Sequence, residues 1–415
     1  MTAIPREKSL DSTRAFLSEG YTFISTRCER FQSDLFETRI MLAKAVCMMG
    51  TEAAREFYEP GRFTRKQALP KPTLWLLQDQ SSAQVLDGAA HRHRKQMLMS
   101  LMTPTAIRRL SDLVADEWRS RIARWRDADE IVLHQEVEDV LCGAVCNWAG
   151  VPLTGSEASA RTREFAAMID GAGAVGPRNW RGMLMRRRTE RWARGVVEKL
   201  RSGEIGPSDG AAAHVIARHR DLDGRLLDIS TAAVELINVL RPTVAVARYI
   251  TFGALALHDH PECRARLQAG DDEYLEFFAQ EVRRHYPFFP VVAGRVLQEF
   301  EWRGRRFAQG EWVILDLYGT NHDPRSWQEP HRFRPERFQH WDGSAYNFIP
   351  QGGGDHFAEH RCAGEWITVE LVKTAMRLLT REMSYRVPPQ DLRVDLSRMP
   401  AIPNSRFRIG DVRGL

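Results

Sequence analysis

The stretch from Leu226 to His258 constrains the fold of this chain more than any other feature of the sequence. Its residues are apolar nearly all round, and a helix without a polar face has to run through the core of a protein. The same stretch contains Arg241 and Pro242 side by side. Proline inside a helix costs about 3 kcal/mol, and an unpaired buried charge adds a further penalty. We therefore expect both residues to have a use. The alternative is a kinked helix whose arginine reaches the surface.

Helical patterns dominate the chain up to about residue 285. Apolar residues recur every three or four positions over 103–125, which is typical of an amphipathic helix. Further along, the alternation of Val313, Leu315 and Leu317 predicts short hairpin strands. No repeat, low-complexity tract or linker interrupts the sequence. The expected fold is mainly α with a small β region, in a single domain covering residues 1–415.

The composition excludes several classes of protein. Hydrophobic residues make up 43% and charged residues 27%, which is globular rather than disordered or fibrous. The net charge of +5 is too small to indicate a nucleic-acid partner. Six cysteines without a C-x-x-C pair make no disulfide framework, and residues 1–14 lack a signal-peptide core. The most apolar run, 242–257, is too short to cross a bilayer. We expect a cytoplasmic protein with no stable membrane anchor.

An arginine-rich run from Arg181 to Arg201 has two interpretations. Its charge suggests contact with RNA or a membrane. However, Trp192, Val196 and Leu200 recur within it at helical spacing, which favours a solvated amphipathic helix.

A loop rich in glycine and histidine ends at Cys362. The glycines at 352–354 let the backbone approach another group closely. If a helix begins just after Cys362, its N–H groups and Arg361 lower the pKa of the thiol. Such a sulfur can be an axial iron ligand. The alternatives are an inert buried cysteine and a zinc site with His356 and His360, although a fourth zinc ligand is missing.

Two shorter motifs precede this loop. Glu281 and Arg284 are three residues apart, so they share a helix face and can pair, either inside the protein or as a surface ion pair. Arg337 follows in a Pro-Glu-Arg-Phe motif. A Glu-x-x-Arg helix, Asn-His-Asp-Pro at 321–324, Pro-Glu-Arg-Phe and a loop ending in His-x-Cys-x-Gly-Glu occur in this order. Together they resemble the cytochrome P450 (heme-thiolate) superfamily over essentially the whole chain.

The resemblance implies a fold in which heme b (iron protoporphyrin IX) lies between the long central helix and the cysteine loop. Cys362 would ligate the iron, and Glu281, Arg284 and Arg337 would form a buried structural triad. By family position, the residues that would contact the heme propionates are His91, Lys95, Arg65, Arg295 and His360. The charged run that begins at His91 could instead be a solvated helix face.

The sequence departs from the common family pattern in two places. Phe348 lies further ahead of Cys362 than usual, and Arg241-Pro242 stands where monooxygenases carry an acid–alcohol pair. Arg-Pro, together with Gly-Gly-Gly-Asp-His before the ligand, is similar to the fatty-acid peroxygenase branch, family 152. That branch implies hydrogen peroxide as oxidant, no redox partner, and a long-chain fatty acid whose carboxylate binds Arg241 and acts as acid–base catalyst.

The resemblance also bears on the product, through the position of Gln84. In this branch, histidine at that position accompanies decarboxylation to terminal alkenes, and glutamine accompanies hydroxylation. A neutral amide cannot donate a proton as an imidazolium can, which favours hydroxylation, at the α carbon before the β. Phe289 and Pro290 would line the substrate pocket, although Phe289 fits a plain core equally well. Three other functions stay open: a fatty-acid decarboxylase, a redox-partner-dependent monooxygenase, and a heme- or fatty-acid-binding protein without turnover.

Overall fold

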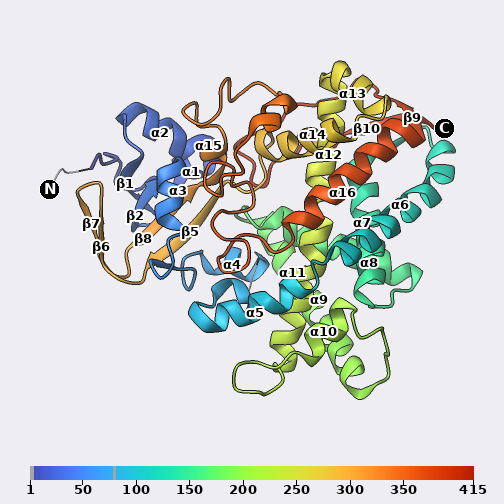
Figure 1. Ribbon diagram of the computed structural model, residues 1–415, viewed down its shortest axis with the longest axis horizontal. Coiled ribbons are helices and arrows are strands. Elements are labelled where there is room, and N and C mark those ends of the chain that lie inside the picture. The colour runs from blue at the N-terminus through green and yellow to red at the C-terminus, as the bar shows by residue number, and fades with distance from the viewer. Residues whose placement is uncertain (1–3, 78–80) are drawn as a thin grey trace.

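Helices account for most of the chain that the computed structural model describes, which is residues 4–77 and 81–415 (Figure 1). The α-helices are α1 (Thr13–Glu19), α2 (Phe23–Phe31), α3 (Thr51–Phe57), α4 (Lys71–Leu77), α5 (Gly88–Ser100), α6 (Pro104–Arg126), α7 (Leu133–Ala149), α8 (Gly155–Gly171), α9 (Pro177–Ser202), α10 (Ala212–Arg218), α11 (Ile229–Ala245), α12 (Ala247–Asp259), α13 (Pro261–Gln268), α14 (Asp272–His285), α15 (Leu317–Asn321) and α16 (Glu365–Arg377). Shorter helical turns are η1 (Gly20–Thr22), η2 (Ala83–Val85), η3 (Pro335–His340) and η4 (Leu378–Glu382). The strands are β1 (Leu35–Ile40), β2 (Ala43–Met48), β3 (Phe63–Thr64), β4 (Glu130–Val132), β5 (Val291–Val296), β6 (Phe300–Trp302), β7 (Arg305–Phe307), β8 (Trp312–Asp316), β9 (Met383–Arg386) and β10 (Arg408–Gly414). The predicted mainly helical fold is confirmed.

The expected core helix is present as two consecutive helices, α11 and α12, which meet at Val246. Helix α11 begins where the carboxylate of Asp228 accepts the backbone N–H of Thr231 at 2.9 Å, as an N-cap does. By length and hydropathy the joined segment 229–259 could cross a membrane. However, 83% of its most apolar window is buried inside the protein, which is what a core helix requires.

The other long helices surround this central segment. Helix α11 packs against α7, α8 and α9, and α12 packs against α7, α14 and α16. In Figure 1, α16 runs beside α12, and the strands β1, β2 and β8 lie on the opposite side of the molecule from α6 and α7. The arginine-rich run lies on α9, where Val196 and Leu200 are buried and Arg187 and Arg188 are exposed. This confirms the predicted amphipathic helix.

A five-stranded sheet has the order β1-β2-β8-β5-β3. Strand β8 runs antiparallel to β5, with Leu315 opposite Val292, and parallel to β2, with Val313 opposite Val46. Both faces of β8 are buried, and its residues are apolar except for Asp316 at its end. The predicted strand is confirmed at Val313 and Leu315 as β8, whereas Leu317 begins α15. Strands β6 and β7 form a separate hairpin.

The helical patterns that dominate before residue 285 gave no indication of the β1–β2 hairpin. Met41 and Leu42 form its turn with φ angles of 53° and 62°, without the glycine or asparagine that marks such turns. Residues outside the hairpin hold the turn instead. The hydroxyl of Thr13 accepts the Met41 N–H at 2.5 Å, and the carboxylate of Asp11 accepts the Leu42 N–H at 2.6 Å.

Candidate functional site

Cys362 lies in the turn that leads into α16. Its backbone N–H donates to the carbonyl of Gln351 at 3.1 Å, and the amide nitrogen of Gln351 lies 3.6 Å from the sulfur. Five of the six cysteines are buried, whereas Cys362 is partly exposed. Cys362 is therefore the one cysteine of the six that is not enclosed in the core.

Burial raises the pKa of the Cys362 thiol, contrary to the expectation from the sequence. The positive charge of Lys95, the N–H of Gly364 and the positive charge of Arg283 act in the expected direction, but desolvation outweighs them. A bound metal cation changes this balance, because coordination deprotonates a thiol outright. The helix terminus alone does not make the thiolate.

Glu365 joins the cysteine loop to α14. Its carboxylate accepts a hydrogen bond from Nε of Arg361 at 2.6 Å and forms an ion pair with Arg283 of α14. Although burial opposes it, the two arginines hold the pKa of Glu365 well below its usual range. This buried ion-pair group fixes the start of α16, and with it the position of Cys362.

The zinc alternative finds no support at this loop. The ring of His356 stacks on Trp366, with centroids 4.3 Å apart, and His360 lies against His91. Over 4–77 and 81–415, these two histidines and Cys362 do not gather into a group that could hold a metal ion.

Four of the five expected propionate partners lie close together. The ring centroids of His91 and His360 are 3.9 Å apart, and Nζ of Lys95 donates to the carbonyl of Arg361. Arg65 donates to the carbonyl of Ala293 at 2.9 Å. Burial, with the positive charges of Arg65, His91 and Lys95, holds the pKa of His360 well below its usual value. The group therefore brings the cations Arg65 and Lys95 close to two histidines, with the carboxylate of Glu359 acting on Arg65.

The same group fits the carboxylates of a heme. Nε2 of His91 is buried and has no hydrogen-bond partner among the residues that the structure describes. No ion pair within those residues involves Arg65 or Lys95. A buried polar atom without a partner is costly, and two propionates would supply both the missing acceptors and the missing charge.

Arg295 does not join this group. It lies on β5, and its guanidinium donates to the carbonyls of Gln67 and Gly310, each at 3.2 Å. Its role toward a propionate stays a prediction.

Arg241 is buried on α11, with 5% of its surface exposed, so its side chain does not reach the solvent. Its guanidinium donates to the backbone carbonyls of Leu76 and Leu77 at the end of α4, and lies 3.4 Å from Oδ1 of Asn238. Burial, with the charge of Arg186, lowers the pKa of Arg241 to about 9, which leaves it charged at neutral pH. No ion pair among the described residues includes Arg241. Pro242 follows it inside the same helix.

Gln84 lies in η2, next to the same part of α11. Its side-chain oxygen accepts a hydrogen bond from Nδ2 of Asn238 at 3.4 Å. Asn238 thus lies between Gln84 and Arg241, and the fold brings the two predicted residues to one place. The loop that precedes Gln84 includes residues 78–80, which lie outside the described residues.

Phe289 and Pro290 follow α14. Phe289 is 37% exposed and packs edge-on against Phe288, which contacts Tyr249 of α12, so it is not a plain core residue. The carbonyl of Pro290 accepts the N–H of Leu317 at 3.0 Å, which ties the segment to the start of α15. A contact of either residue with substrate stays a prediction.

Glu281, Arg284 and Arg337 lie together inside the protein. Arg284 binds the Glu281 carboxylate through Nε at 2.7 Å and Nη2 at 2.8 Å, and Nε of Arg337 lies 3.2 Å from it. Glu281 and Arg284 are both 0% exposed, so they are not a surface pair. Arg284 also donates to the carbonyl of Asn321 at 3.0 Å, which connects α14 to the end of α15.

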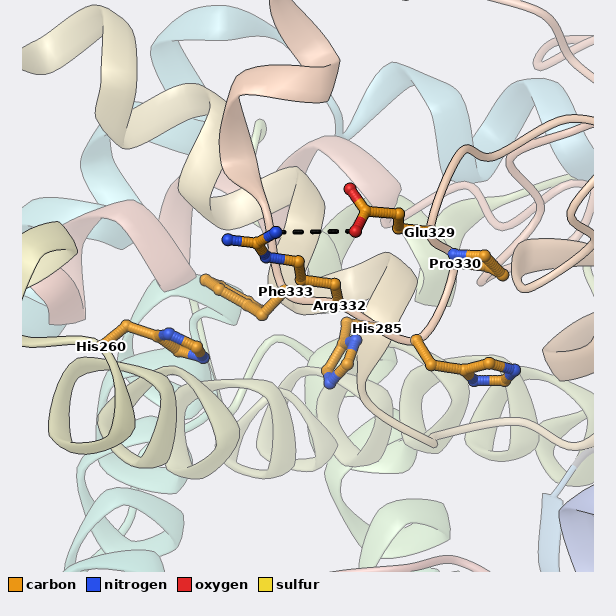
Figure 2. Close-up of a pocket in the computed structure, with 7 residues that line it drawn as sticks. His260, His285, Glu329, Pro330, Arg332 and Phe333 are labelled. Carbon is orange, nitrogen blue, oxygen red and sulfur yellow. Dashed lines mark ion pairs between the residues drawn. The ribbon is translucent and has the colours of Figure 1, made fainter.

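A separate open pocket of about 560 Å³ lies beside this triad (Figure 2). Its lining residues are His260, His285, Glu329, Pro330, His331, Arg332 and Phe333. Figure 2 shows the ion pair between Glu329 and Arg332, at 3.5 Å. Neither Cys362 nor Arg241 lines this pocket, so it is not part of the candidate site.

Two groups near Arg241 were not predicted from the sequence. Glu235 is 0% exposed on α11 and pairs with Arg94 of α5 at 3.1 Å. Glu235 could have been identified from the sequence in the same way as Arg241, because it is a charged residue in an otherwise apolar helix. The carbonyls of Leu76 and Leu77 carried no such signal, because every residue has one.

The comparisons with known proteins agree with this arrangement. The sequence profile of the family described as Cytochrome P450 matches residues 261–402. Among solved structures, cytochrome P450SP alpha (CYP152B1) is 48% identical, with 98% of this chain and 100% of that chain covered and a TM-score of 0.96. Cytochrome P450EX alpha (CYP152N1), solved with myristic acid, is 43% identical over all of both chains, with a TM-score of 0.96. A variant of cytochrome P450 OleT in complex with arachidonic acid is 34% identical over 100% of this chain and 99% of that one, also at 0.96.

Proposed function

The chain belongs to the cytochrome P450 superfamily, in the fatty-acid peroxygenase branch (family 152), and we propose that it uses hydrogen peroxide to hydroxylate long-chain fatty acids at the α carbon. Membership makes it a heme-thiolate oxidoreductase. The observation that carries the proposal is the buried, charged Arg241, which has no ion-pair partner in the described ranges.

The proposed substrate carboxylate binds Arg241. A guanidinium has five N–H donors in a planar fork. The carbonyls of Leu76 and Leu77 and Oδ1 of Asn238 accept from three of them. These carbonyls orient the group but do not neutralise it, so the site favours a carboxylate that does. P450EX alpha and the OleT variant were solved with myristic and arachidonic acid, both of which carry a carboxylate. P450SP alpha was also solved with the carboxylic acid (R)-ibuprophen.

Arg241 would hold the carboxylate in the position of the acid–alcohol pair that the central helix lacks. The bound carboxylate then accepts a proton from hydrogen peroxide and returns it to the departing oxygen, as a general acid–base group. Pro242 carries no N–H, so the helical hydrogen bond to the carbonyl of Asn238 is missing next to Arg241. The overall reaction balances as RCH2COOH + H2O2 → RCH(OH)COOH + H2O, so no redox partner is required.

The residues that would hold heme b are Cys362, His91, Lys95, Arg65 and His360, with Arg295 as a further candidate. Bound through the Cys362 thiolate, the heme supplies peroxide cleavage and C–H oxidation.

Gln84 supports hydroxylation over decarboxylation. Its amide lies against Asn238, in reach of the segment that would bind the carboxylate. An amide cannot donate a proton as an imidazolium does. A carboxylate fixed on Arg241 also presents the carbons nearest to it, which favours the α carbon.

The test uses purified, heme-loaded protein with myristic acid and hydrogen peroxide, without a reductase. Gas chromatography with mass spectrometry identifies the product, and methyl myristate, which lacks the carboxylate, is the matched control. 2-Hydroxymyristic acid from the acid and none from the ester supports the proposal. A 3-hydroxy acid would contradict the preference for the α carbon, and 1-tridecene would contradict the role given to Gln84. No product with intact heme would favour a redox-partner-dependent monooxygenase or a binding protein.

A further inference from the structure

Resting on the proposed function, we propose that Glu235 and Arg94 are positioning residues that hold the Ala83–Gln84 segment against α11 and so set which carbon is oxidised. Neither residue needs to contact substrate for this. The inference concerns how the chain fixes a short non-helical segment next to Arg241.

The carboxylate of Glu235 makes two contacts through one oxygen. It accepts the backbone N–H of Ala83 at 2.7 Å and lies 3.1 Å from Nη1 of Arg94. Glu235 is 0% exposed and Arg94 is 3% exposed. The hydrogen bond from Ala83 is therefore charge-assisted and shielded from water, which makes it stronger than an ordinary backbone hydrogen bond.

The other side of Ala83 is held as well. Its carbonyl lies 3.1 Å from Nδ1 of His91, on the same helix as Arg94. The backbone of Ala83 is thus fixed between α11 and α5, and Gln84 is the next residue along the chain. A segment held at both its N–H and its carbonyl has little freedom to shift along α11.

The contacts of this segment follow the helical repeat of α11. Glu235, Asn238 and Arg241 are spaced three residues apart, so they share one face of the helix. In that order they contact Ala83, Gln84 and the carbonyls of Leu76 and Leu77. Leu76, Leu77, Ala83 and Gln84 therefore contact side chains that follow one another along α11, with Arg241 at one end and Glu235 at the other.

A buried ion pair is not needed for stability at such a place. Apolar residues of similar volume often stabilise a fold as much as a buried ion pair or more. The better-supported use of a buried pair is to fix one arrangement of the segments that it joins. Burial raises the pKa of Glu235, and the charge of Arg94 and the N–H of Ala83 act against that rise. Arg94 is held in turn by Asp221 at 2.6 Å, whose side chain is 37% exposed. The pair thus fixes the Ala83 peptide group relative to Arg241.

The position of this segment matters because a displacement of about 1 Å at a reacting centre changes rates by as much as 100-fold. Oxidation at the α or β carbon differs by only one carbon–carbon bond along the chain. Release of Ala83 would let Gln84 move relative to a carboxylate held on Arg241. We therefore expect the ratio of 2-hydroxy acid to other products to change while the fatty acid still binds.

The test compares three variants of the heme-loaded enzyme with myristic acid and peroxide. Glu235→Ala removes the acceptor for Ala83, and Glu235→Gln keeps an acceptor oxygen there. Asp221→Asn is the control, because it removes a charge beside Arg94 but keeps an acceptor oxygen for it. We expect Glu235→Ala to lower the ratio of 2-hydroxy acid to other products by about threefold or more. Glu235→Gln and Asp221→Asn keep the wild-type ratio. An unchanged ratio in Glu235→Ala, or an equal change in Asp221→Asn, overturns the proposal.

Hydrogen exchange provides a readout that does not depend on turnover. We expect the amides of 81–87 to exchange faster in Glu235→Ala than in the wild type. In Glu235→Gln they should exchange at the wild-type rate. A wild-type exchange rate in Glu235→Ala contradicts the proposal. If Glu235→Ala does not fold, Ala83→Pro removes the same hydrogen bond from the donor side, at the first position of a helical turn, where proline fits. If the wild type makes no hydroxy acid, the proposed function fails, but the exchange experiment still decides whether Glu235 holds this segment.

Discussion

Arg241 of α11 donates a hydrogen bond to the backbone carbonyl of Leu76, 165 residues earlier in the chain. The contact joins the central helix to the end of α4 and determines where the guanidinium points. A carbonyl dipole holds the cation but does not cancel its charge. The contact therefore leaves a buried guanidinium with a fixed orientation and an uncompensated positive charge, which a bound carboxylate would neutralise.

Replacing Arg241 with alanine should lower kcat/KM for myristic acid by about 100-fold, because the buried anchor for the carboxylate is lost. Heme content, measured from the absorption spectrum, should stay at the wild-type level. Arg187→Ala, which changes an exposed arginine of α9, is the matched control and should retain activity. Full activity in Arg241→Ala would show that the carboxylate binds elsewhere.

Replacing Cys362 with alanine should abolish the thiolate-type absorption of the reduced carbon monoxide complex. The reason is that no other partly exposed cysteine lies among the six. Cys263→Ala, a buried cysteine bonded to Tyr274, is the control and should keep the signature. If the signature survived in Cys362→Ala, the assignment of the iron ligand would be wrong.

Replacing Arg284 with methionine should destabilise the protein by about 3–5 kcal/mol, because it leaves the carboxylate of Glu281 buried with only Arg337 beside it. The midpoint of chemical unfolding measures the change. Arg332→Ala breaks the exposed pair with Glu329 instead and should cost less than about 1 kcal/mol. Equal effects of the two substitutions would contradict the structural role of the triad.

Replacing Asp316 with asparagine should make the protein more stable at high pH relative to the wild type. Burial raises the pKa of Asp316 from 3.8 to about 7, so the folded state prefers the protonated carboxyl. The wild type therefore loses stability as the pH rises between about 4 and 7, since the unfolded state then binds fewer protons than the folded state. Asparagine does not titrate and can still accept the N–H of Gly319.

Melting curves of Asp316→Asn and the wild type at pH 5 and pH 8 check this. The difference between the two proteins should shift by about 1–4 kcal/mol in favour of the variant at the higher pH. Asp112→Asn, at an exposed position of α6, should show no such shift. A constant difference across this range would mean that Asp316 stays ionised in the folded protein.

Much of the candidate site could be predicted from the sequence because its residues are unusual for the segments that contain them. Arg241 and Pro242 stand out in an apolar helix, and Cys362 follows a run of glycines. Glu281 and Arg284 have the spacing of one helix face. Each of these features depends on residue type and short-range spacing, which folding preserves. The same holds for the core helix and for the strands after residue 287.

The rest depends on contacts between distant segments. The β1–β2 turn lacks a local turn signal because Asp11 and Thr13 hold it from outside. The pKa of the Cys362 thiol was expected to fall, but burial, which the sequence does not show, raises it. Arg295 has the charge expected of a propionate partner, and only the tertiary structure shows that its guanidinium donates to the carbonyls of Gln67 and Gly310.

By itself, the sequence determined that a charge and a proline lie within the central helix, that a single cysteine has the setting of a metal ligand, and that an acid and two arginines can pair. Only the tertiary structure decided that Arg241 points at the carbonyls of Leu76 and Leu77, and that Glu235 and Arg94 hold Ala83 beside it. The physical reason is that backbone carbonyls and N–H groups are the same at every residue. Which of them meets a buried charge depends on how the helices pack, and not on any local pattern of side chains.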